Sequence, residues 1–61
     1  AMIKLSKVWV QQDTVTLIEF DKPSQNKCLI TVVTLDSGQW FTLTNEDPDY
    51  LSDISILKSM W

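Results

Sequence analysis

The turn at residues 36–38, Asp-Ser-Gly, constrains this chain most, because it holds the only glycine and separates two apolar runs. The runs cover residues 28–35 and 39–44, and both are rich in Val, Ile, Thr, Phe and Trp. Such residues fit the pleated, half-buried surface of a sheet. Two runs of this kind joined by a short glycine-containing turn predict an antiparallel β-hairpin.

The register of this hairpin has two solutions. In the first, the turn has three residues and Gly38 forms a left-handed bulge, so that Val33 faces Phe41. In the second, the turn has two residues and Leu35 faces Trp40. We favour the first, because glycine adopts positive φ without steric cost, whereas a two-residue type I′ turn would hold a serine there. The bulged register puts Trp40 on the face opposite to the one shared by Leu29, Val33, Leu35, Phe41 and Leu43.

The length of 61 residues leaves room for a single small domain with a thin core. A chain of this size buries only roughly 60% of its unfolded surface, so its stability margin is small. One cysteine and no histidine exclude an internal disulfide and the usual zinc ligand sets. We therefore expect no metal or cofactor, and we expect a homo-oligomer in which association completes the core.

The charge balance is acidic, with 8 acidic and 5 basic residues and a net charge of −3. All basic residues are lysines, so no guanidinium group is present for bidentate recognition of phosphate or guanine. Nucleic-acid binding is therefore disfavoured. No run of about 18 apolar residues exists, so we expect a soluble, cytoplasmic protein without a membrane partner. Ala1 precedes Met2, which we expect to be the natural start of a complete small protein.

Two further strands are expected before the hairpin. Residues 3–10 predict a first strand, and residues 14–20 predict a second strand that pairs back on the first. The apolar pattern of the second slips near Leu17, which indicates either a bulge or a strand covered on both faces. Residues 21–27 are polar and include Pro23, so they predict a surface loop.

The C-terminal segment carries a helix-start signal, with Asp47 as N-cap and Pro48 at the first helical position. We predict a helix from Pro48 to about Met60. Its apolar stripe consists of Tyr50, Ile54, Leu57 and Trp61, with Asp53 and the serines Ser52, Ser55 and Ser59 mostly on the polar side. The alternative is a fifth strand over residues 53–58, because this stretch also alternates between polar and apolar residues.

The predicted fold class is α+β, mainly β. It consists of a four-stranded antiparallel meander of two hairpins, with the C-terminal helix packed on one face. The alternative with a fifth strand resembles an SH3-like small barrel in its order of elements, although no motif supports that resemblance.

The sequence offers little catalytic chemistry. Without histidine, a Ser-His or Cys-His pair is impossible and the commonest general base near neutral pH is missing. The four acidic residues Glu46, Asp47, Asp49 and Asp53 fit helix capping better than catalysis. Cys28 fits a small apolar filler at the start of a strand better than a reactive thiol. We therefore expect a protein that is not an enzyme.

Three tryptophans in so short a chain are the clearest departure from average composition. A core of this size can hardly enclose them all, and tryptophan is enriched at binding hot spots. Trp40 is the best candidate for exposure. The residues predicted to contact a partner are Trp40, Trp9, Trp61, Thr42 and Tyr50.

Two functional hypotheses follow. The first is a non-enzymatic protein-interaction or regulatory module that binds a protein through one sheet face and a free strand edge, and that self-associates. The alternative is a small barrel that stacks nucleic-acid bases on Trp9, Trp40 or Tyr50, with lysines along the backbone path.

Overall fold

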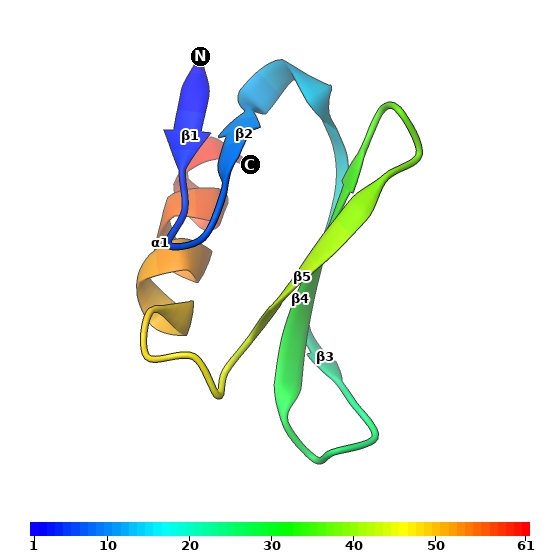
Figure 1. Cartoon of the computed structure of the whole chain (residues 1–61), viewed down its shortest axis with the longest axis vertical. Helices are drawn as coiled ribbons and strands as arrows, with labels where there is room; N and C mark the ends of the chain where they lie inside the picture. Colours follow the sequence, from blue (N-terminus) through cyan, green and yellow to red (C-terminus); the bar gives the residue numbers. More distant parts are fainter.

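The computed structural model covers residues 1–61 and contains five strands and one α-helix (Figure 1). The elements are β1 (Met2–Lys4), β2 (Trp9–Gln11), the 3₁₀ helix η1 (Gln12–Thr14), β3 (Val15–Pro23), β4 (Leu29–Leu35), β5 (Trp40–Thr44) and α1 (Tyr50–Met60). β1 pairs with β2, and β3, β4 and β5 form a separate three-stranded antiparallel sheet. The predicted class, α+β and mainly β with a C-terminal helix, is confirmed, and the barrel alternative is wrong because the sheets do not close.

The hairpin of β4 and β5 has the predicted bulged register. Val33 lies opposite Phe41, and Thr34 lies opposite Trp40. Gly38 has a φ of +89°, and the Leu35 N–H donates to the Gln39 carbonyl at 2.8 Å. The left-handed glycine thus closes the turn in a conformation that a side chain would strain.

The N-terminal segment differs from the expected single strand over residues 3–10. The chain turns after Leu5, whose N–H donates to the Val8 carbonyl at 2.9 Å, and Ile3 pairs with Val10. In a straight strand, Leu5 and Val10 would point to opposite faces, because side chains alternate. The turn brings both side chains into the core, where they are buried. As a consequence, β3 pairs with β4 and not with the N-terminal strand.

The long strand β3 contains two irregularities. The pairing register shifts between Val15 and Leu17, which confirms the break predicted near Leu17. A second shift lies between Glu19 and Lys22, where Asp21 has a φ of +49°. The strand continues to Pro23, so the loop expected over residues 21–27 begins three residues later than predicted. Proline is tolerated there because Pro23 ends the strand.

The helix α1 begins at Tyr50, two residues after the predicted start, and the fifth strand proposed for residues 53–58 is wrong. The N-cap is Asp49 and not Asp47 as predicted, and no side chain makes a cap hydrogen bond. Asp47 Oδ1 instead accepts the Asp49 N–H at 3.1 Å, in the turn that precedes the helix. Tyr50, Ile54 and Leu57 point inward and are buried. No helix of this chain combines the length and the apolar character that a membrane crossing requires.

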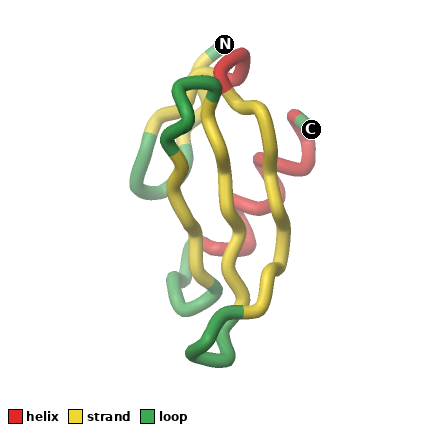
Figure 2. Tube along the Cα trace, turned by 90° about the vertical axis from the view of Figure 1, so that its right-hand side faces the viewer, coloured by secondary structure: helices red, strands yellow, loops and turns green.

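The core lies between the three-stranded sheet on one side and α1 with the β1–β2 hairpin on the other. Figure 2 shows the three strands side by side with α1 crossing behind them, so that one sheet face is covered and the other is open. The core consists of nine buried apolar residues: Leu5, Val10, Val15, Ile18, Val33, Leu43, Tyr50, Ile54 and Leu57.

Candidate interaction surface

The open face of the three-stranded sheet carries a cross-strand row of three side chains. Leu17 of β3 lies opposite Thr34 of β4, which lies opposite Trp40 of β5. Trp40 is 65% exposed and Leu17 is 48% exposed, so both present apolar surface to solvent. Trp40 therefore lies on the open face, as the bulged register predicts. The register shift before Leu17 turns this leucine to the same face.

Two further rows complete the open face. Glu19, Val32 and Thr42 form the second, and Lys22, Ile30 and Thr44 form the third. We call these nine residues of the three rows the outer face: Leu17, Glu19, Lys22, Ile30, Val32, Thr34, Trp40, Thr42 and Thr44. Its only charged residues lie on β3, where Lys22 Nζ is 3.5 Å from Glu19 Oε2. The rest of the outer face combines apolar side chains with threonine hydroxyls, a composition suited to a protein interface.

The edge of the sheet at β5 is also open, since β4 is the only strand that pairs with β5. The Leu35 N–H donates to the Gln39 carbonyl, and the Asn45 N–H donates to the Leu29 carbonyl at 3.0 Å. These bonds show that the odd-numbered residues of β5 direct their backbone N–H and C=O groups toward β4. Antiparallel ladders alternate, so Trp40 and Thr42 direct their backbone N–H and C=O groups away from β4.

Trp9 and Trp61 are exposed on other parts of the molecule. Trp9 belongs to the separate two-stranded sheet, where the Lys4 Nζ lies 5.8 Å from its ring centroid. Trp61 follows the end of α1 and is 59% exposed. Of the five residues predicted to contact a partner, only Trp40 and Thr42 lie together on the outer face.

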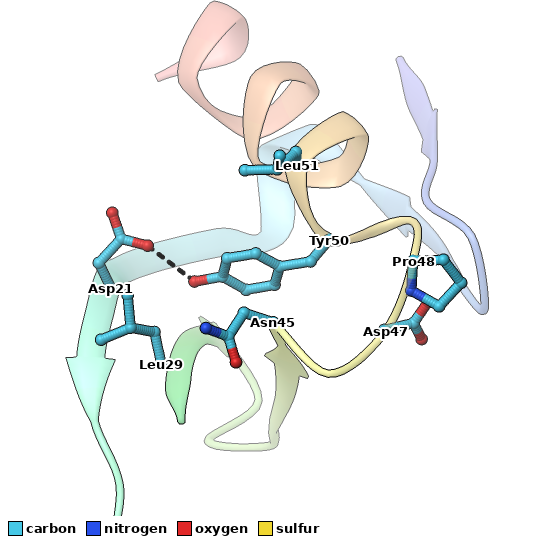
Figure 3. A pocket seen from close by; sticks show the side chains of 7 residues that line it. All are labelled: Asp21, Leu29, Asn45, Asp47, Pro48, Tyr50 and Leu51. Atoms are coloured by element: carbon cyan, nitrogen blue, oxygen red, sulfur yellow. Dashed lines mark hydrogen bonds between the residues drawn. The ribbon is translucent and has the colours of Figure 1, made fainter. Parts of the chain in front are cut away.

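Tyr50, the fifth predicted contact residue, is only 4% exposed and serves the interior. Its hydroxyl donates to Asp21 Oδ1 at 2.8 Å and lies 2.9 Å from Thr31 Oγ1, which accepts the Asp21 N–H at 3.4 Å. Figure 3 shows the Tyr50 ring extended from the start of α1 toward Asp21. Burial raises the pKa of Tyr50, and the Asp21 carboxylate raises this pKa further. These bonds tie α1 to β3 and β4 and leave the ring unavailable for base stacking.

A shallow cleft of about 520 Å³ lies beside Tyr50. Its lining residues, drawn in Figure 3, are Asp21, Leu29, Asn45, Asp47, Pro48, Tyr50 and Leu51. The Asp47 carboxylate is paired with the Lys7 Nζ at 2.6 Å, which holds the pKa of Asp47 below its ordinary value and that of Lys7 above it. Both carboxylates of the cleft are therefore engaged, that of Asp21 by the Tyr50 hydroxyl and that of Asp47 by Lys7.

Asp53 and Cys28 have structural contacts. Asp53, expected on the polar side of the helix, is 4% exposed. Its Oδ1 accepts the Ser6 N–H at 3.0 Å, and its Oδ2 accepts the Ser6 hydroxyl at 2.6 Å. Cys28 is half-buried, with its Sγ 3.0 Å from Ser24 Oγ. No group of three or more His, Cys, Asp and Glu side chains is arranged to hold a metal ion.

Sequence reasoning missed Leu17 as part of this surface and missed Asp53 as a buried acceptor. The predicted bulge near Leu17 was the available signal for the first, because a bulge reverses which face the following residues occupy. No local signal marks the second, since Ser6 and Asp53 are 47 positions apart. Comparison of the chain with protein-family models, with curated proteins and with solved structures finds no match.

Proposed function

We propose that this chain is a non-enzymatic protein-interaction or regulatory module that self-associates and binds through the outer face and the β5 edge. The observation that carries the proposal is the row of Leu17, Thr34 and Trp40 on a sheet face that no element of the chain covers. Tryptophan is among the residues enriched at binding hot spots, and Trp40 presents its ring on this open face.

The energetics favour covering this row. Apolar surface removed from water contributes roughly 25 cal/mol per Å². A small domain exposes such a face at a cost in solubility, and contiguous apolar patches on soluble proteins commonly mark interaction sites. The threonine hydroxyls of Thr34 and Thr42 beside Trp40 supply hydrogen-bonding groups without the desolvation cost of a charge.

The nucleic-acid alternative has weaker support. Its barrel does not form, Tyr50 is buried, and two of the five lysines are paired with carboxylates: Lys7 with Asp47 and Lys22 with Glu19. Lys4 beside Trp9 is the one arrangement that suits a stacked base with a nearby phosphate. A single lysine contributes little of the phosphate affinity on which such binding depends.

Sedimentation equilibrium of the wild type, Trp40→Ser and Trp61→Ser tests the proposal. Trp61 is a matched control, because it exposes 59% of its surface against 65% for Trp40 but lies outside the outer face. We expect the wild type to associate in the micromolar range, Trp40→Ser to associate roughly tenfold or more weakly, and Trp61→Ser to match the wild type. A wild type that stays a 7.0 kDa monomer, or equal weakening by both substitutions, would overturn it.

A further inference from the structure

The two open edges of the three-stranded sheet differ in how they are protected. β3 has two register shifts, the charged residues Glu19 and Lys22 on its outer face, and a terminal Pro23. β5 pairs with β4 without a register shift, and residues 39–44 contain neither a charge nor a proline. Natural sheets use bulges, charges and proline to prevent edge-to-edge pairing. The β5 edge lacks all of these.

The backbone at this edge has groups free for pairing. Trp40 and Thr42 direct their N–H and C=O groups outward, and none of the turn, loop and side-chain hydrogen bonds involves these groups. Thr44 accepts one bond at its carbonyl, from the Asp47 N–H at 3.0 Å, and this oxygen retains a second lone pair. A partner strand would therefore find a continuous set of donors and acceptors along β5.

We propose that the occupant of this edge is a second copy of the chain, paired antiparallel through β5 in a symmetric register centred on Thr42. The two three-stranded sheets then join into one six-stranded sheet. Thr42 faces Thr42 of the partner subunit, and Trp40 faces Thr44 of the partner subunit. This inference rests on the proposed function and deepens it by naming the partner and the register.

Self-complementarity is the argument for a second copy. In a dimer with two-fold symmetry the same surface of both subunits is in contact, so a charged side chain near the axis would lie opposite an identical charge. The five residues of β5 are all uncharged, and the nearest charged residues, Asp36 and Glu46, lie beyond its two ends. Although each copy carries a net charge of −3, the paired strands therefore place no like charges opposite each other. The row of Leu17, Thr34 and Trp40 also continues across the junction of the two β5 strands, because Trp40 faces Thr44 of the partner subunit.

A charge swap at position 42 tests the register. Lysine or glutamate at this position would face its own copy across the axis, so Thr42→Lys and Thr42→Glu should each associate about fivefold more weakly than the wild type. An equimolar mixture of the two should recover association, because each Lys then faces a Glu. Sedimentation equilibrium at two salt concentrations measures both, and far-UV circular dichroism confirms that these exposed-site variants fold.

The same swap at Thr34 is the matched control. Thr34 lies on the outer face one strand inward from β5, so its two copies would be more than about 14 Å apart in the six-stranded sheet. Thr34→Lys and Thr34→Glu should therefore show no recovery on mixing. If mixing restores association for the Thr34 variants and not for the Thr42 variants, the sheets meet face to face and strand pairing is wrong.

The outcomes separate this inference from the proposed function. If Trp40→Ser weakens association but neither Thr42→Lys nor Thr42→Glu changes it, the proposed function stands and the strand pairing is overturned. A mixture of Thr42→Lys and Thr42→Glu no tighter than either variant alone would also overturn the register. A monomeric wild type would overturn both.

Discussion

At the scale of single residues, Tyr50 shows how a buried hydroxyl finds hydrogen-bond partners and how its surroundings change its pKa. It is the only tyrosine, so the absorbance of tyrosinate reports this group alone. Burial disfavours the phenolate and, with the Asp21 carboxylate, raises the pKa of Tyr50 above its ordinary value of 10.0. Because this pKa is higher in the folded state, stability should fall as the pH rises above about 10. We expect the native titration midpoint to exceed the midpoint measured in urea.

The control for this prediction is Asp21→Asn, which keeps the shape of the side chain and removes its charge. We expect the native midpoint to fall but to stay above that of the unfolded chain, since burial is the largest cause of the shift. Identical midpoints for the native and unfolded wild type would show that Tyr50 is exposed to water in solution.

At the scale of elements, the bond between Ser6 and Asp53 joins the β1–β2 hairpin to α1. Both carboxylate oxygens of Asp53 accept bonds from Ser6, and the side chain is buried. Asp53→Ala removes two hydrogen bonds between Ser6 and a charged group, so it should lower the free energy of unfolding by about 1–3 kcal/mol. Asp53→Asn should cost less, because the amide oxygen still accepts one bond. Urea unfolding followed by tryptophan fluorescence measures both changes.

Asp49→Ala is the matched control for the Asp53 variants. Asp49 is also acidic and immediately precedes α1, but its side chain is exposed and makes no hydrogen bond or ion pair. Its loss should cost only about 0.3–1 kcal/mol, through the interaction of the carboxylate with the helix dipole. Equal destabilisation by Asp49→Ala and Asp53→Ala would contradict a structural role for the Ser6 bond.

At the scale of the whole molecule, the thin core links stability to association. Nine buried apolar residues form the core, while Trp40 and Leu17 remain exposed on the outer face. A partner that binds only the folded chain stabilises it by mass action. We therefore expect the thermal midpoint of the wild type to rise with protein concentration. The midpoint of Thr42→Lys should depend less on concentration, and a wild-type midpoint independent of concentration would contradict the linkage.

The elements that could be predicted from the sequence are the ones with local signals. Gly38 and its flanking β-branched runs specify the hairpin of β4 and β5, since only glycine readily adopts the positive φ of that turn. Asp47 and Pro48 mark the start of the helix to within two residues. The exposure of Trp40 follows from the same register, so the one aromatic residue of the outer face was predictable once the turn was chosen.

The features that could not be predicted depend on contacts between distant residues. The turn after Leu5 contains no glycine, proline or asparagine, and it forms where the Ser6 donors meet the Asp53 carboxylate. The hydrogen bonds of the buried Tyr50 hydroxyl likewise depend on Asp21 and Thr31, which lie on two other elements.

The sequence by itself therefore determined the mainly β class, the bulged hairpin and the C-terminal helix. Each of these follows from backbone preferences and periodicity within a few neighbouring residues. Only the tertiary structure decided that the N-terminal segment folds back on itself, that Asp53 is an interior group, and that Leu17 joins Trp40 on the outer face. The physical reason is that burial and hydrogen-bond satisfaction are properties of the packed chain, so they depend on which distant residues meet.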